Sequence, residues 1–182
     1  MPRLLPLPTP WPGLGLAAAA VLFALLGAPT PVRAQAQTEA ALMARLTLSL
    51  TRFVQWPGIA SGDPLRVCVA QRDAAIARAF AEADGQLVNG RRIQVVKAPP
   101  VAGCSVLFVH ASAERVPDLL RAASGGPVLI VSDADGTMNL GGMVEFVAVN
   151  DSIRFDVNMA AFRHAQLTVS SQVLRLARQV RE

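Results

Sequence analysis

The sequence predicts an α/β fold with a mixed, largely parallel sheet sandwiched by helices, and an antiparallel hairpin near the C-terminus. First, strand-like and helix-like segments alternate between residues 65 and 131, as they do in parallel sheets. Second, Cys104–His110 and Pro127–Val131 are continuous apolar runs, which are typical of strands covered on both faces. Third, Gly141–Asn158 alternates apolar with polar residues on either side of Asn150-Asp151, a pair that suits a tight turn.

The N-terminal segment, residues 1–36, has the features of a signal peptide. Arg3 supplies a positive charge, and Leu14–Leu26 is an uncharged apolar run. Small residues precede two candidate cleavage sites, after Ala34 and after Ala36. The alternative is an uncleaved anchor, but the run is shorter than the roughly 20 apolar residues that a spanning helix needs. We therefore predict cleavage and a periplasmic location for the mature chain.

Residues 37–182 are predicted to form one domain, since their number suits a single core. The whole chain has 17 basic and 13 acidic residues, and Arg3 and Arg33 lie in the leader, so the basic excess after cleavage is small. Basic residues form no cluster larger than Arg91-Arg92, which argues against nucleic acid as a partner. No second apolar stretch is long enough to span a bilayer, so we expect no membrane span after cleavage.

The first half of this domain is predicted to contain two helices around a strand. Leucines at helical spacing predict a helix over Gln37–Trp56, and Pro57 is expected to stop it. Leu65–Ala70 has the composition of a short strand. Asp73 is a suitable N-cap for a helix that continues to about Ala83.

The second half completes the alternation. Arg91–Lys97 alternates as a strand, and Ala113–Ala123 has the apolar spacing of a helix. Asn158–His164 is predicted to be a short helix, interrupted at Leu167–Ser170 by β-branched residues. Apolar residues on one side then predict a closing helix over Ser171–Val180.

The chain has two cysteines, Cys68 and Cys104. An even number in an exported protein favours a disulfide, which we predict for this pair. The alternatives are two free buried thiols or a metal site. A metal site would need further ligands at motif spacing, and neither His110 nor His164 supplies them.

The candidate chemistry is confined to Ser132–Gly136, which follows a buried strand at the edge where α/β proteins often bind ligands. Asp133 and Asp135 could hold a cation, but the glutamate that closes a calcium loop is missing, and turn formation explains both residues. The sequence also lacks the G-x-S-x-G and glycine-rich nucleotide motifs. We therefore predict no catalytic residue, no cofactor and no metal.

Taken together, these elements resemble the YfiR family of bacterial periplasmic regulators, and the matching segments occur in the family's order. They are FVQWP at Phe53–Pro57, RVCVA at Arg66–Ala70, CSVLFVH at Cys104–His110, PVLIVSDADG at Pro127–Gly136, GGMVEF at Gly141–Phe146, IRFDVN at Ile153–Asn158 and LTVSSQVLRLA at Leu167–Ala177. Two features differ: Leu48-Ser49-Leu50 replaces an aromatic-Asn-Phe type pattern, and a second cysteine pair is missing.

The resemblance implies a non-enzymatic protein that binds the periplasmic domain of an inner-membrane signalling protein. In the best-known case that target is a diguanylate cyclase, whose repression keeps cyclic-di-GMP and biofilm formation low. The alternative is a periplasmic small-molecule-binding module that serves a transporter or a sensor kinase through Ser132–Gly136. The sequence leaves open whether the chain also forms a homodimer.

The first and last helices are the predicted docking face for such a partner. Arg175 and Arg178 lie on polar positions of the last helix, where they could meet an acidic surface. The competing interpretation is an ordinary solvated face.

Overall fold

The computed structural model describes residues 31–58, 62–150 and 152–182, and side chains from residue 35 onward. Residue contacts divide the chain into two units, Met1–Ala34 and Gln35–Glu182, and the second contains the fold described below. Most of the predicted signal peptide lies outside the described residues, as does Asp151 of the predicted turn. Cleavage of residues 1–36 therefore stays a prediction.

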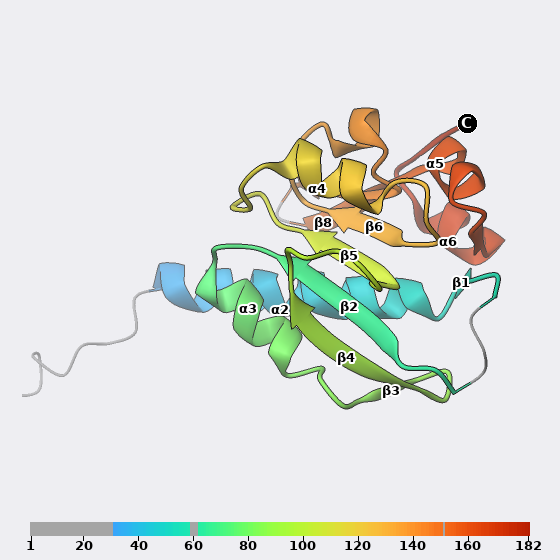
Figure 1. Ribbon diagram of the computed structural model, residues 1–182. Helices are drawn as coiled ribbons and strands as arrows, with labels where there is room; N and C mark the ends of the chain where they lie inside the picture. The colour runs from blue at the N-terminus through green and yellow to red at the C-terminus, as the bar shows by residue number, and fades with distance from the viewer. Residues whose placement is uncertain (1–30, 59–61, 151) are drawn as a thin grey trace, which may run out of the picture. The chain divides into compact units, whose positions relative to one another are not determined.

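Eight strands form one mixed sheet in the order β10-β8-β7-β6-β5-β2-β4-β3 (Figure 1). The pairs from β4 through β2, β5 and β6 to β7 are parallel, whereas β7 with β8 and β3 with β4 are antiparallel. The strands are β2 (Leu65–Ala70), β3 (Leu87–Val88), β4 (Arg91–Lys97), β5 (Val106–Val109), β6 (Leu129–Ser132), β7 (Val144–Val149), β8 (Ser152–Asn158) and β10 (Gln179–Arg181). The predicted α/β fold with a largely parallel sheet is confirmed.

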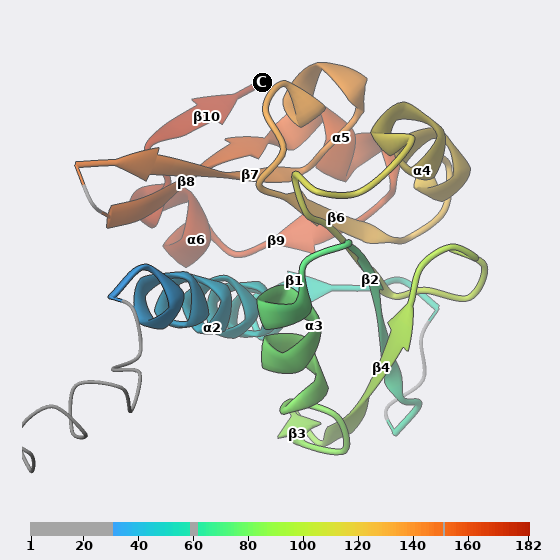
Figure 2. The same ribbon diagram turned by 90° about the vertical axis from the view of Figure 1, so that its left-hand side faces the viewer.

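Helices cover both faces of this sheet (Figure 2). The chain passes from β2 through α3 to β4 on one side, then returns to β5 and passes through α4 to β6 on the other. Right-handed crossovers in opposite directions place α3 and α4 on opposite faces. The helices are α2 (Pro31–Thr51), α3 (Ala74–Ala81), α4 (Val116–Ala123), α5 (Met159–His164) and α6 (Ser171–Leu176), with a 3-10 helix, η2, at Thr137–Leu140.

The core lies around the central strands. All four residues of β5 and all four of β6 are buried, as their continuous apolar sequences predict. The rings of Phe80 from α3 and Phe108 from β5 pack with centroids 4.7 Å apart. Asp73 caps α3 as predicted, since its Oδ1 accepts hydrogen bonds from the backbone N–H groups of Ala75 and Ile76 at 2.7 and 3.0 Å.

The predicted hairpin is present as β7 and β8, which pair antiparallel with Phe146 opposite Phe155. Asn150 has a positive φ of 46°, as a tight turn requires. Gly142, which precedes β7, lies so close to η2 that a Cβ there would be 2.9 Å from the carbonyl oxygen of Thr137. Because it has no Cβ, Gly142 allows this close approach of two backbone segments.

The first helix ends earlier than predicted, at Thr51 instead of Trp56. Residues Val54–Gln55 form strand β1, which pairs antiparallel with β9 (Thr168–Val169) in a separate small sheet. Trp56 donates a hydrogen bond from Nε1 to the carbonyl oxygen of Ser105 at 3.1 Å. The FVQWP segment is therefore an extended connection that ties the end of α2 to the second half of the chain.

The closing helix is also shorter than predicted. It ends at Leu176, and Gln179–Arg181 forms β10, which lies parallel to β8 at the edge of the main sheet. Helix α4 begins at Val116 instead of Ala113, because Pro117 has no backbone N–H and is tolerated only in the first turn. Among the described residues, none of the helices is long and apolar enough to cross a membrane.

Candidate functional site

The predicted disulfide joins Cys68 of β2 to Cys104, which precedes β5, and their Cα atoms lie 5.8 Å apart. Cys68 is fully buried and Cys104 is 7% exposed. Because β2 and β5 are paired neighbours, the bond crosslinks adjacent strands in the centre of the sheet. Its position indicates a structural role.

A small pocket lies at the carboxyl ends of the parallel strands, where the alternative interpretation of the sequence places a small-molecule site. Its volume is about 130 Å³, and we call it the strand-end pocket. Its polar lining residues are Asp73, which follows β2, His110, which follows β5, Asp133, which follows β6, and Glu39 of α2. After β2 the chain adds β4 on one side of that strand and then β5 on the other, so the strand order reverses between β2 and β5. Open α/β sheets commonly bind ligands at such a point.

His110 has polar contacts at both ring nitrogens. Nδ1 accepts a hydrogen bond from the backbone N–H of Ser112 at 3.1 Å and lies 2.7 Å from the Ser112 hydroxyl. Because Nδ1 is an acceptor, the neutral ring carries its proton on Nε2, which lies 3.3 Å from Oδ2 of Asp133. The other carboxylate oxygen of Asp133 accepts from the backbone N–H of Ala111 at 2.9 Å.

The charge of this pocket depends mainly on Asp133, whose side chain is only 9% exposed. Burial raises the pKa of Asp133, and the neighbouring His110 partly opposes that rise. The two hydrogen bonds from the first turn of α3 lower the pKa of Asp73, which keeps this carboxyl group ionised. The pocket thus combines carboxylates with an oriented imidazole, a set that can bind small polar groups.

The polar contacts run from Ser112 through His110 to Asp133, as they do in a serine-protease triad. Here, however, Ser112 follows His110 by two residues in one tight turn, and its hydroxyl and backbone N–H both contact the same ring nitrogen. The Ser112 hydroxyl accepts a hydrogen bond from the backbone N–H of Arg72 at 2.9 Å, which joins the loops after β2 and β5. The backbone N–H of the same serine already bonds to the histidine nitrogen that would act as base. In the described part of the chain, no group of three or more His, Cys, Asp or Glu residues is placed to hold a metal ion.

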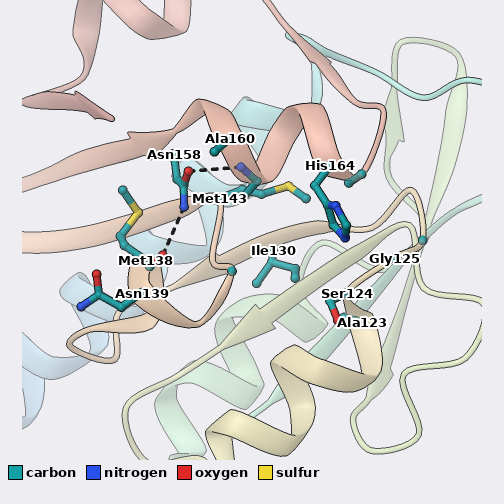
Figure 3. A pocket seen from close by; sticks show the side chains of 14 residues that line it. Ala123, Ser124, Gly125, Ile130, Met138, Asn139, Met143, Asn158, Ala160 and His164 are labelled. Atoms are coloured by element: carbon teal, nitrogen blue, oxygen red, sulfur yellow. Dashed lines mark hydrogen bonds between the residues drawn. The ribbon is translucent and has the colours of Figure 1, made fainter. Parts of the chain in front are cut away.

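A second pocket, the α5 pocket, lies between α4, η2 and α5 and has a volume of about 320 Å³ (Figure 3). Asn158 borders it as the N-cap of α5: its Oδ1 accepts from the N–H of Ala161, and its Nδ2 donates to the carbonyl of Met138, both at 3.1 Å. The other lining residues are Ala123, Ser124, Gly125, Gly126, Ile130, Asn139, Gly141, Met143, Ala160, His164 and Ala165. Sequence reasoning missed this pocket, because alanines and glycines from three separate segments carry no recognisable motif.

The two predicted partner-binding arginines have different environments. Arg175 is exposed on α6 and makes one 3.3 Å contact with the Ser171 hydroxyl. Arg178 lies beyond the helix, and its guanidinium binds both carboxylate oxygens of Asp156, at 2.9 and 2.5 Å. Asp156 is 2% exposed, and its hydrogen bonds raise the pKa of Arg178. The structure therefore does not place the two arginines on one exposed helix face.

The structure is thus an α/β domain with a mixed sheet, helices on both faces and two described pockets. The chain belongs to the YfiR/HmsC-like family, whose model matches residues 40–178. This is a family of regulatory, non-catalytic periplasmic proteins. The match covers seven of the eight strands of the main sheet, from β2 to β8, together with α3, α4, α5 and α6, and it ends at Arg178, just before β10.

The fold is also similar to a solved structure, described as the ABC domain in complex with L-Trp from Streptococcus pneumonia. The TM-score is 0.52 at 13% sequence identity, and the match covers 75% of this chain. The chain spans 61% of that structure's length. At this level of identity the likeness concerns the fold alone.

Proposed function

We propose that this protein is a non-enzymatic periplasmic regulator that binds the periplasmic domain of an inner-membrane diguanylate cyclase and represses it. The observation that carries the proposal is the family match, which extends over residues 40–178 and includes every strand of the central sheet except β10. The N-terminal segment with signal-peptide features supports the location.

The proposed docking face consists of the C-terminal end of α2 and helix α6. These segments are far apart in sequence, but strands β1 and β9 join them, and the N–H of Ser170 donates to the carbonyl of Phe53 at 2.9 Å. Two large apolar side chains are exposed there, Phe53 at 38% and Leu176 at 68%. Arg175 adds a positive charge beside them, which would attract an acidic partner surface.

The test compares Arg175→Glu with Arg78→Glu in cells that carry the cyclase. Arg78 is an exposed arginine on α3, away from the proposed face, and is the matched control. Deletion of the gene should raise cyclic-di-GMP, and wild type and Arg78→Glu should restore the low level, whereas Arg175→Glu should not. An unchanged cyclic-di-GMP level after deletion of the gene would contradict the proposed regulatory function. Full repression by Arg175→Glu would contradict only this docking face.

A small-molecule-binding module is the second candidate function, and the strand-end pocket favours it. The pocket lies at the Ser132–Gly136 edge that the sequence singled out, and its lining is polar. The similar solved structure is described in complex with L-Trp, an amino acid. Calorimetry of the purified protein against amino acids should then detect binding that Asp133→Asn weakens and that Asp135→Asn, in the same loop but exposed, leaves unchanged. Equal binding by both variants would count against this pocket.

A further inference from the structure

The α5 pocket has a lining that restricts the chemistry of a ligand. Among its fourteen lining residues there is no Asp, Glu, Lys or Arg. A charged group placed there would find no ionic partner among the lining residues, and the neighbouring Arg181 guanidinium is bonded to Asn139 at 3.2 Å. The lining itself therefore favours uncharged groups. It differs in this respect from the strand-end pocket, where three carboxylates surround a histidine.

The size and the apolar groups of the α5 pocket indicate a small ligand with a flat ring. Ligand pockets typically range from about 300 to 1,000 Å³, and 320 Å³ is near the lower limit. Alanines and glycines make up half of the lining, so the walls are close to backbone and leave room for a planar group. Met138 and Met143 also line the pocket, and sulfur contacts with aromatic rings are favourable.

His164 supplies the polar contact. Figure 3 shows its imidazole extending from α5 toward Ile130 and Ser124 on the facing wall. The amide of Asn158 is already used in two hydrogen bonds, and the Ser124 hydroxyl donates to the carbonyl of Arg121 at 2.8 Å. Within the described residues, His164 is the polar side chain of this lining that makes no hydrogen bond. It can accept one from an N–H or O–H group of a ligand.

We propose that the α5 pocket binds a small uncharged aromatic molecule that carries one N–H or O–H group, such as an indole or a phenol, with that group bonded to His164. The apolar ring would contact the methionine sulfurs and Ile130. The site is separate from the strand-end pocket and from the proposed docking face, so the inference does not depend on the identity of the protein partner.

The experiment is calorimetric titration of the purified protein with three uncharged aromatic probes, indole, p-cresol and 4-hydroxyindole, and with L-Trp and tryptamine as charged comparators. Ala160→Phe fills the pocket from an exposed position on α5, and Ala81→Phe is the matched control on α3. At least one uncharged probe should bind with 1:1 stoichiometry. Ala160→Phe and His164→Ala should each weaken that binding about tenfold or more, since the pocket contacts are the main source of affinity for so small a ligand, and Ala81→Phe should leave it unchanged.

Three results would overturn the proposal. One is that none of the three uncharged probes binds the wild-type protein. Another is that a probe binds and Ala160→Phe, with an unchanged thermal unfolding midpoint, binds it equally well. The third is that L-Trp or tryptamine binds more tightly than the uncharged probes and Ala160→Phe abolishes that binding, which would show that the pocket accepts charge.

Discussion

Removal of the Cys68–Cys104 disulfide is expected to cost much of the stability of this domain. The bond closes a loop with a sequence separation of 36 residues. In the chain-entropy model, releasing a loop of that length stabilises the unfolded state by about 4 kcal/mol. Domains of this kind have total stabilities of about 5–15 kcal/mol. The double variant Cys68→Ala/Cys104→Ala should therefore unfold at a much lower urea concentration than the oxidised wild type.

The measurement is urea unfolding of the oxidised wild type, the reduced wild type and the double variant. The reduced wild type is the matched control, because it loses the crosslink but keeps both buried sulfur atoms. Both altered forms should lose about 4 kcal/mol, and the double variant slightly more because of the missing sulfur volume. Thiol labelling of unreduced, denatured wild type should find no free cysteine. Losses below about 1 kcal/mol in both forms would refute the crosslink argument, and quantitative labelling of both cysteines would refute the bond itself.

Three further predictions concern single side chains. Arg175→Glu should change the free energy of unfolding by no more than about 0.5 kcal/mol. Arg178→Glu should clearly lower the midpoint of urea unfolding, because it places a second carboxylate against the buried Asp156. Equal urea midpoints for the two variants would contradict the ion pair. Because burial raises the pKa of Asp133 in the folded protein, its stabilising contribution is present below the ordinary value of 3.8 and is lost as pH rises through the raised value. Wild type should thus lose stability relative to Asp133→Asn as the pH rises above 3.8, and parallel pH profiles would show that the carboxyl group is not perturbed. Gly142→Ala should lower the thermal midpoint, since the new Cβ would meet a backbone carbonyl of η2 at 2.9 Å; an unchanged midpoint would mean that η2 can move.

The central sheet could be predicted from sequence because its strands are specified by their own residues. The apolar runs that contain β5 and β6 fit no amphipathic helix, and Asp73 marks the start of α3 by its capping chemistry. The short strands could not be predicted in this way. Strands β1, β9 and β10 have two or three residues each, too few to show a period, and they exist because a distant segment pairs with them.

The error at the end of α2 has a local cause. Pro57 only forbids helical geometry at the preceding residue, so it sets the farthest point that a helix could reach. The helix ends five residues earlier, where the Thr51 hydroxyl donates to the carbonyl of Leu48 at 2.6 Å and the N–H of Phe53 donates to Leu50. Such hydrogen bonds from side chains to the backbone compete with regular helical geometry. The spacing of apolar residues in the sequence does not indicate where they form.

The strand-end pocket was predicted in part. The sequence placed Asp133 at the correct edge, since that follows from the end of a buried strand. The sequence could not show that Glu39 and Asp73 line the same pocket as Asp133. Helices α2 and α3 reach the carboxyl ends of the strands only through tertiary packing. The α5 pocket was not predictable at all, since its character comes from small side chains on three segments that meet only in the folded chain.

The C-terminal strand shows how one buried charge determines a local fold. Asp156 lies on β8 at the edge of the sheet and is almost fully buried, so it requires a compensating charge. Arg178 supplies that charge, and its N–H also donates to the carbonyl of Phe155 at 2.8 Å, which starts the pairing of β10 with β8. A helix continued to Val180 would turn Arg178 away from Asp156, so α6 ends at Leu176 despite apolar spacing that fits a longer helix. Arg175 sits on α6, three residues before this ion pair. The two arginines thus differ because only Arg178 meets the buried carboxylate, whereas Arg175 contacts the Ser171 hydroxyl of its own helix.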